Sequence, residues 1–401
     1  MRSCLIVLLA PFLTTAAEPA QPRPAVHLTD AALKIHQEAL LIDGHNDLPY
    51  QFRESNDLSF RSMDITRHCK NLHTDIPRLR KGNVGAQFWS AYVAASTAHD
   101  GTAVRLTLEQ IDFIHRLVRA YPNDFEMAYS VADIERIRKS GKIASLIGVE
   151  GGHSIDSSLG TLRMMYSLGV RYLTLTHSET LPWADSATDK PKSNGLSQFG
   201  KDVVREMNRL GMMVDLSHVS AEVMKQAIEI STAPIIFSHS SAFAIAPHPR
   251  NVPDEVLKLL PKNGGVVMIN FFPGFITPEG ARVTRDFFGI YRDMKAKIKD
   301  PKEFEIAWAQ WKKDHPLPRG SVHHVVDHIE HVIKTAGIDH VGIGSDFDGI
   351  NSTPVQLEDV SCYPFITQEL LNRGYNKEQI HKILGGNVLR AFRAVEKAAG
   401  K

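Results

Sequence analysis

The stretch Ile143-Ala144-Ser145-Leu146-Ile147-Gly148-Val149-Glu150-Gly151 is apolar until it reaches a carboxylate. A short apolar run ending at glycine is typical of a strand buried on both faces of a parallel sheet. A carboxylate at the end of such a strand is costly to bury without a compensating partner. Taken alone, Glu150 can cap a helix, join a salt bridge or bind a metal ion.

Runs of the same kind recur along the chain and alternate with stretches of helical periodicity. The other expected strands are residues 40–48, 84–93, 171–177, 211–219, 233–240, 264–271 and 340–347. The expected helices between them are residues 106–121, 159–168, 199–210, 221–230, 254–260 and 322–336, with closing helices at 377–384 and 387–398. Eight strands in this alternation predict an α/β fold, a (β/α)8 TIM-type barrel. The rival, a doubly wound open sheet, normally carries a glycine-rich phosphate loop after an early strand, and this sequence shows none.

One segment interrupts this alternation between the seventh and eighth strands. Residues 276–320 mix aromatic side chains with many charged ones and predict an inserted helical excursion. Such an insertion can be a solvated hairpin packed against the barrel, a lid or a subunit contact.

The first residues predict an export signal at 1–17, and therefore a periplasmic or secreted protein. Arg2 precedes an apolar stretch at 4–13, and Thr15-Ala16-Ala17 supplies small residues for cleavage. The stretch is too short to span a bilayer comfortably, and an uncleaved apolar tail is the alternative. We expect residues 18–39 to form a leader and a first helix, and residues 40–401 to form the barrel domain. Cys69 and Cys362 would remain after cleavage, as one disulfide or as two free thiols.

Overall composition is that of an ordinary globular protein: 43% of residues are hydrophobic, and 46 Lys and Arg balance 45 Asp and Glu. No long basic run or nucleic-acid-binding motif is present, so we expect no nucleic-acid partner. No second long apolar segment predicts a membrane-spanning helix.

Polar residues stand where the apolar strands should end. They are His45 and Asp47 on the first strand, then Glu150, His177, His218, His239 and Asp346 on the third, fourth, fifth, sixth and eighth. The carboxyl ends of barrel strands open onto the face where active sites are built. Side chains alternate along a strand, so His45 and Asp47 point the same way. Imidazole and carboxylate groups without cysteine suit an open catalytic site for zinc or another divalent transition metal.

These residues lie in stretches that resemble the membrane (renal) dipeptidase family, a branch of the metal-dependent amidohydrolases. The similar stretches are 42–49 (IDGHNDLP), 148–154 (GVEGGHS), 173–178 (LTLTHS), 215–220 (DLSHVS), 237–241 (FSHSS) and 345–349 (SDFDG). The resemblance extends over residues 41–396 and implies two zinc ions in a (β/α) barrel, a dipeptide substrate and a possible homodimer.

The resemblance also implies a role for each residue. His45 and Asp47 would bind the first zinc, Glu150 would bridge both ions, and His218 and His239 would complete the second. His177 would hold and polarise the substrate carbonyl. Arg250 would meet the terminal carboxylate of the substrate. Asp346 would bind substrate and handle the proton, with Asp348 as the competing candidate.

The implied reaction is zinc-dependent hydrolysis of dipeptides, with D-residues at the C-terminal position and β-lactam opening as possible extensions. The chain departs from the family after the seventh strand, where Phe271, Phe272 and Phe275 stand in place of an expected tyrosine. Two alternatives stay open: a related metal hydrolase of lactones, cyclic amides or nucleobases, and a non-catalytic binding protein on the same barrel.

Overall fold

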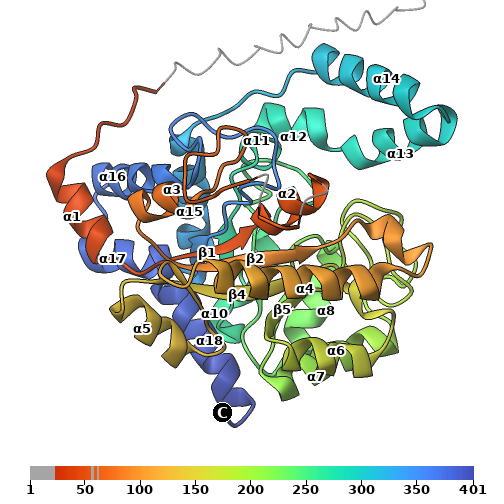
Figure 1. Ribbon diagram of the computed structural model, residues 1–401, viewed down its shortest axis with the longest axis horizontal. Coiled ribbons are helices and arrows are strands. Elements are labelled where there is room, and N and C mark those ends of the chain that lie inside the picture. The colour runs from red at the N-terminus through yellow and green to blue at the C-terminus, as the bar shows by residue number, and fades with distance from the viewer. Residues whose placement is uncertain (1–22, 56–57, 61–62) are drawn as a thin grey trace, which may run out of the picture.

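Eight parallel strands close into a barrel, as the alternation of strands and helices predicts (Figure 1). The computed structural model describes residues 23–55, 58–60 and 63–401, so the predicted export signal lies outside the described residues. The barrel strands are β1 (Leu41–Asn46), β2 (Val84–Tyr92), β4 (Ile143–Glu150), β5 (Val170–Thr174), β6 (Met213–Asp215), β7 (Ile236–Phe237), β8 (Val266–Ile269) and β9 (Val341–Ile343). Parallel pairing of β9 with β1, at Ile343 and Asp43, closes the ring. The predicted fold class is confirmed.

One further strand, β3 (Phe125–Met127), was not predicted. It pairs in parallel with the start of β4, where Phe125 lies opposite Ile143, and takes no place in the closed ring. Its three residues lack the longer apolar run that marks the other short strands in the sequence.

Helices surround the barrel (Figure 1). Those before the insertion are α1 (Asp30–Glu38), α2 (Leu48–Glu54), α3 (Ile76–Lys81), α4 (Ala103–Ala120), α5 (Val131–Lys139), α6 (Leu159–Ser167), α7 (Gln198–Leu210), α8 (Ala221–Ile230), α9 (Asp254–Leu257) and α10 (Leu260–Asn263). Those after it are α15 (Val322–Ala336), α16 (Pro364–Asn372), α17 (Lys377–His381) and α18 (Asn387–Ala398), with a π-helical turn at Lys382–Gly386. The helix predicted at 254–260 is two short ones, because Pro261 lacks the N–H that a continuous helix requires.

Side chains of the strands divide between two apolar clusters, as alternation along a strand requires. One cluster, which includes Phe88, Leu146 and Met268, packs the barrel interior. The other includes Trp89 and Val267 and joins the strands to the surrounding helices. With the interior filled by apolar side chains, the cavity-lining polar groups lie at the carboxyl ends of the strands.

The predicted insertion follows β8 and is helical. It contains α11 (Pro273–Ile276), α12 (Pro278–Thr284), α13 (Phe287–Lys297) and α14 (Pro301–Asp314), and the last two project from the barrel (Figure 1). Aromatic contacts hold these two together, with the rings of Phe287 and Trp308 at 4.9 Å and of Tyr291 and Trp308 at 5.2 Å.

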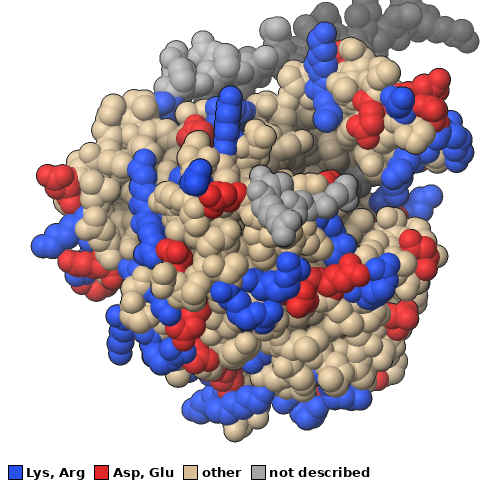
Figure 2. Space-filling view, viewed as in Figure 1, with Lys and Arg blue, Asp and Glu red and all other residues tan. Residues whose placement is uncertain are grey.

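Cys69 and Cys362 are free thiols rather than a disulfide. Over the described ranges, no helix combines the length and apolarity needed to cross a membrane. Lys and Arg lie interspersed with Asp and Glu on the face shown in Figure 2.

Candidate metal centre

The predicted site residues converge at the carboxyl end of the barrel. His45 lies in β1 and Glu150 ends β4, while the others follow their strands within three residues or, for Arg250, lie in the loop between β7 and α9. A cavity of about 490 Å³ is lined by Asp47, Glu150, His177, His218, Arg250 and Asp346. His45 and His239 lie buried beside it. The structure thus brings together all eight residues.

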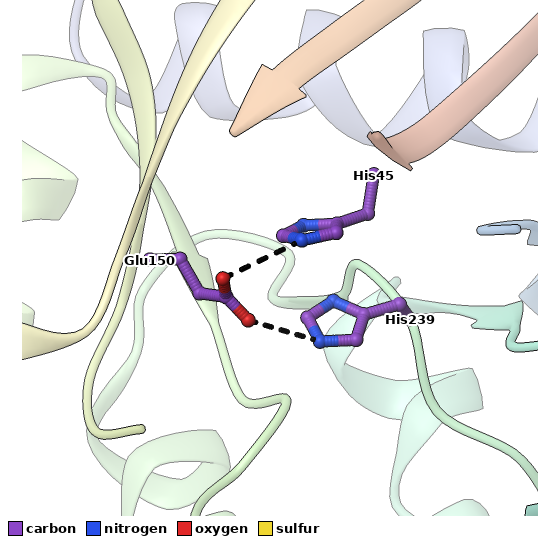
Figure 3. A group of neighbouring side chains, drawn as sticks. All are labelled: His45, Glu150 and His239. Carbon is purple, nitrogen blue, oxygen red and sulfur yellow. Dashed lines mark ion pairs between the residues drawn. The ribbon is translucent and has the colours of Figure 1, made fainter. Parts of the chain in front are cut away.

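Glu150 lies at the centre and presents one carboxylate oxygen to each side (Figure 3). Oε2 lies 3.6 Å from Nε2 of His45. Oε1 lies 2.9 Å from Nε2 of His218 and 3.3 Å from Nε2 of His239. A carboxylate in this position can serve two neighbouring cations.

His45 is held by a residue that the sequence analysis did not identify. Its Nδ1 lies 2.9 Å from the hydroxyl of Tyr172, which donates to the carbonyl of Gly44 over 3.2 Å. The Nδ1–H of His45 therefore donates to Tyr172, and Nε2 of the neutral ring, which lies 3.0 Å from Oδ2 of Asp47, is left to bind a ligand. Gly148 makes this possible, because a Cβ there would lie 1.9 Å from the Tyr172 ring.

The donor atoms suit a divalent metal ion. Nε2 of His218 and Nε2 of His239 lie 2.9 Å apart, so both imidazoles can direct a nitrogen lone pair at one cation. Oδ1 of Asp47 is buried without a hydrogen-bond partner among the described residues. Imidazole nitrogens and carboxylate oxygens are ligands that zinc and similar metals accept. The residues fit a metal centre.

Three triplets of ligand atoms each lie within 4.8 Å of one another. They are His45, Glu150 and His239; Glu150, His177 and His218; and His45, Asp47 and Asp346. Because the triplets share members, they form one continuous cluster.

Burial shifts the pKa values of the groups beside this cluster. It lowers the pKa of His177 to about 4, so this imidazole is neutral at pH 7. It raises the pKa of Asp346 to about 7, against the coulombic effect of His45 and together with that of Asp47 and Glu150. His177 stacks on His218 with ring centroids 4.2 Å apart, and the ring of Tyr92 lies 4.7 Å from the His177 ring.

Two of these residues adopt a left-handed backbone. His218 has φ 69° and Asp346 has φ 66°. Such conformations cost energy in non-glycine residues and persist where the surrounding structure imposes them, often at functional sites.

Arg250 brings a buried positive charge to the cavity. It is 1% exposed, and no carboxylate oxygen of the described chain lies within ion-pair distance of its guanidinium. Its hydrogen bonds, to the Ser240 hydroxyl and the His239 carbonyl, are both 3.4 Å long. Burial lowers its pKa to about 10, which still leaves it charged at neutral pH. A cation in this state is suited to a carboxylate ligand.

Two of the three phenylalanines after β8 lie where the sequence analysis expects them, beside the substrate pocket, and one does not. Phe272 and Phe275 line the cavity, together with Phe287 of the insertion. Phe271 does not, because it is fully buried in the core and packs against Phe347 at 5.5 Å.

Comparison with known proteins agrees with this geometry. Residues 29–401 match the family described as Membrane dipeptidase (Peptidase family M19). The chain is 41% identical to Dipeptidase 3 of Mus musculus over 379 residues. This match covers 93% of this chain and 68% of that relative. Dipeptidase 3 of Rattus norvegicus is 40% identical over 379 residues, covering 93% of this chain and 69% of its own length. The chain belongs to the membrane dipeptidase family. It is a metallopeptidase of the dipeptidase type, and its family membership implies a metal cofactor.

Solved structures share the fold of this dipeptidase. The probable dipeptidase PvdM from Pseudomonas aeruginosa is similar with a TM-score of 0.79 and 24% identity, covering 92% of this chain and 98% of that one. A metallopeptidase from Rhodobacter sphaeroides, liganded with a phosphinate mimic of the dipeptide L-Ala-D-Ala, has a TM-score of 0.72 and 24% identity, covering 89% and 99%.

The dipeptidase site includes further residues that the sequence analysis missed. Tyr172 supports His45, Asn270 donates to Asp346 over 2.9 Å, and the Ser90 hydroxyl lies 3.3 Å from Glu150. Asn270 had a detectable signal, because it is a polar residue at the end of an otherwise apolar strand. Tyr172 and Ser90 had none, since each lies within a strand.

Proposed function

We propose that this dipeptidase hydrolyses dipeptides with two zinc ions held at the barrel rim. The observation that carries the proposal is the position of Glu150, with one oxygen toward His45 and the other toward His218 and His239. In this assignment Asp47 and His45 would hold the first ion, His218 and His239 would hold the second, and Glu150 would be a ligand of both. A pair of such cations supplies Lewis-acid activation of a carbonyl and of a water at neutral pH.

Arg250 would select the substrate. Its buried guanidinium would bind the free C-terminal carboxylate, and the cavity of about 490 Å³ has room for a small molecule. A peptide with many residues beyond the scissile bond places no carboxylate at Arg250. Short peptides are therefore favoured over internal bonds.

His177 and Asp346 would act on the scissile amide. The neutral imidazole of His177 lines the cavity and can donate an N–H to the carbonyl oxygen as negative charge develops. Asp346 would accept a proton from the attacking water and deliver it to the leaving amine. Asn270, which donates to Oδ2 of Asp346, would keep this carboxylate oriented.

Two finer features belong to the proposal. A D-residue at the C-terminal position would be accepted, which the phosphinate ligand of the Rhodobacter sphaeroides metallopeptidase supports by similarity of fold. β-Lactam opening would be a side activity, because it is also hydrolysis of an amide.

The test combines metal analysis with a panel of substrates. Purified protein should contain about two zinc ions per chain and hydrolyse L,L- and L,D-dipeptides. A chelator should abolish the activity and added zinc should restore it. Glu150→Gln should lose both metal and activity, whereas the exposed control Glu305→Gln should keep them. Full dipeptide hydrolysis by demonstrably metal-free protein would overturn the proposal.

A further inference from the structure

Asp215, the last residue of β6, is a buried carboxylate on which four hydrogen-bond donors converge. Oδ1 accepts the backbone N–H of Ser217 at 3.1 Å and that of Ser238 at 2.8 Å. Oδ2 accepts the hydroxyls of Thr174 at 2.5 Å and Ser238 at 2.6 Å. Asp215 is 0% exposed, so these donors replace the water it has lost.

The hydroxyl of Ser238 links this carboxylate to a residue of the metal centre. Its Oγ lies 2.8 Å from Nδ1 of His239. Because an ionised carboxylate only accepts, the single proton of Ser238 is directed to Asp215. The lone pairs of Oγ are then left for His239, whose Nδ1 must carry a proton to complete the bond. Nε2 of His239 therefore keeps a lone pair, and it faces Oε1 of Glu150 at 3.3 Å.

We infer that Asp215, acting through Ser238, is a positioning residue that holds His239 in the tautomer able to bind a metal ion. The inference rests on the proposed metal centre. Partners of this kind fix the orientation and tautomer of ligating histidines, and their loss typically weakens metal binding by about 10- to 100-fold.

The barrel contains a matched arrangement that lacks the link to an imidazole. Asp43, also 0% exposed, accepts the backbone N–H of Ser345 at 2.8 Å and its hydroxyl at 2.7 Å. Ser345 precedes Asp346 just as Ser238 precedes His239. In both cases the serine follows the strand that neighbours the strand of its aspartate. The Asp43 arrangement contacts His45 through backbone atoms, each at 3.4 Å, and ends on a serine beside a carboxylate rather than on an imidazole. Variants of Asp43 and Ser345 therefore show what the loss of a buried Asp–Ser pair does when no imidazole contact is lost with it.

Replacing Asp215 by Asn should reverse the hydrogen bonds. The Asn amide would offer an N–H toward Ser238, so that the serine proton would turn to Nδ1 of His239. The ring proton would then move to Nε2, where it blocks metal binding. Ser238→Ala removes the link without placing a new donor in the core, and Ser238→Thr retains the hydroxyl.

The experiment measures metal affinity by competition with a chromogenic chelator, and metal content by elemental analysis. Ser238→Ala and Asp215→Asn should bind zinc about 10- to 100-fold more weakly than wild type. The zinc affinities of Ser238→Thr, Ser345→Ala and Asp43→Asn should remain within about threefold of the wild-type affinity. This is less than the loss expected when a hydrogen-bond partner of a metal ligand is removed. Thermal unfolding of each metal-free variant identifies any that does not fold, and Ser238→Ala then decides the question.

If folded Ser238→Ala bound zinc as tightly as wild type, the role of Asp215 would be overturned while the metal centre stayed intact. An equal loss in both serine variants would also overturn it, because the effect would then not depend on the imidazole. A wild-type chain that binds no zinc would instead overturn the proposed function, and this inference with it.

Discussion

The side-chain amide of Asn270 donates to Oδ2 of Asp346 over 2.9 Å and accepts the backbone N–H of Phe272 over 2.6 Å. The second bond fixes which end of the amide faces Asp346, because only the oxygen can accept from Phe272. Asn270 is fully buried, so its amide contacts Asp346 from the protein interior rather than from the cavity. Asp346 is thus held from β8, the strand next to its own.

Asn270→Ala should therefore slow the reaction with little effect on substrate binding. Loss of a hydrogen bond to a charged group costs about 1.5–3 kcal/mol, which corresponds to a decrease in kcat of roughly 10- to 100-fold. Steady-state kinetics on a dipeptide will measure kcat and KM separately, with zinc content checked in the same sample. An unchanged kcat at equal zinc content would show that Asp346 does not depend on this contact.

The two aspartates of the SDFDG stretch should differ in their effects. Asp346→Asn should decrease kcat by about 10²- to 10⁴-fold, the usual contribution of a proton-transferring group. Asp348 instead contacts His73. Its Oδ1 accepts the backbone N–H of His73 at 2.7 Å, and its backbone N–H donates to the ring Nδ1 of His73 at 3.0 Å. An Asn at this position keeps an oxygen that can accept the backbone N–H of His73, so the contact that holds Asp348 survives the substitution.

Asp348→Asn should consequently keep kcat within about tenfold of wild type, well below the loss expected for a proton carrier. Both variants would be compared at pH 6.5 with matched zinc content. If Asp348→Asn were the slower enzyme, the proton role would pass to Asp348.

Arg250 should distinguish substrates by their C-terminus. Removing one partner of a buried charge pair costs about 2–5 kcal/mol, so Arg250→Ala should lower kcat/KM for free dipeptides by about 30- to several thousand-fold. Arg250→Lys should recover only part of this, because an ammonium lacks the planar fork of the guanidinium. C-terminally amidated dipeptides should be hydrolysed equally, if slowly, by wild type and Arg250→Ala. An equal loss on both substrate classes would argue against carboxylate recognition.

The sequence was sufficient to predict the barrel, because each apolar run carries its own local signal. All eight runs became barrel strands, yet their ends were less predictable. The run expected at 233–240 forms a ladder only over Ile236–Phe237, and β5 stops three residues before His177. Apolar and buried residues continue past the ladder at the rim, so hydrophobicity alone does not mark the last hydrogen-bonded residue.

The site was predictable in its ligand-type residues and not in their supports. His45 and Glu150 stand out as polar residues in apolar runs. Asp215 stands out in the same way, but its bond to Ser238 joins residues 23 positions apart on different strands. Pairings of this kind arise only when the barrel closes. The left-handed backbone of His218 has no sequence signal either, since glycine is the residue that usually marks such a position.

Acid should destabilise the fold by protonating His328, which lies on α15 and is distant in sequence from the proposed metal ligands. Its Nδ1 accepts the backbone N–H of Ala242 at 2.9 Å, and its Nε2 donates to the carbonyl of Ile276 at 3.2 Å. A protonated ring cannot accept from Ala242, and burial lowers the pKa of His328 to about 4 from the usual 6.5. The unfolded chain therefore binds the proton more readily than the folded chain between these two pH values.

The contribution of His328 to stability is thus complete above about pH 6.5 and is lost as the pH falls toward 4, by an amount on the order of 3 kcal/mol. His328→Asn keeps an acceptor near Ala242 but cannot be protonated, so its free energy of unfolding should vary less with pH across this window. Denaturant unfolding of the metal-free proteins, at steps from pH 7 to pH 4, will measure both slopes, with exposed His27→Asn as the control. Parallel slopes for wild type and His328→Asn would contradict the prediction, because the proton would then be taken up elsewhere.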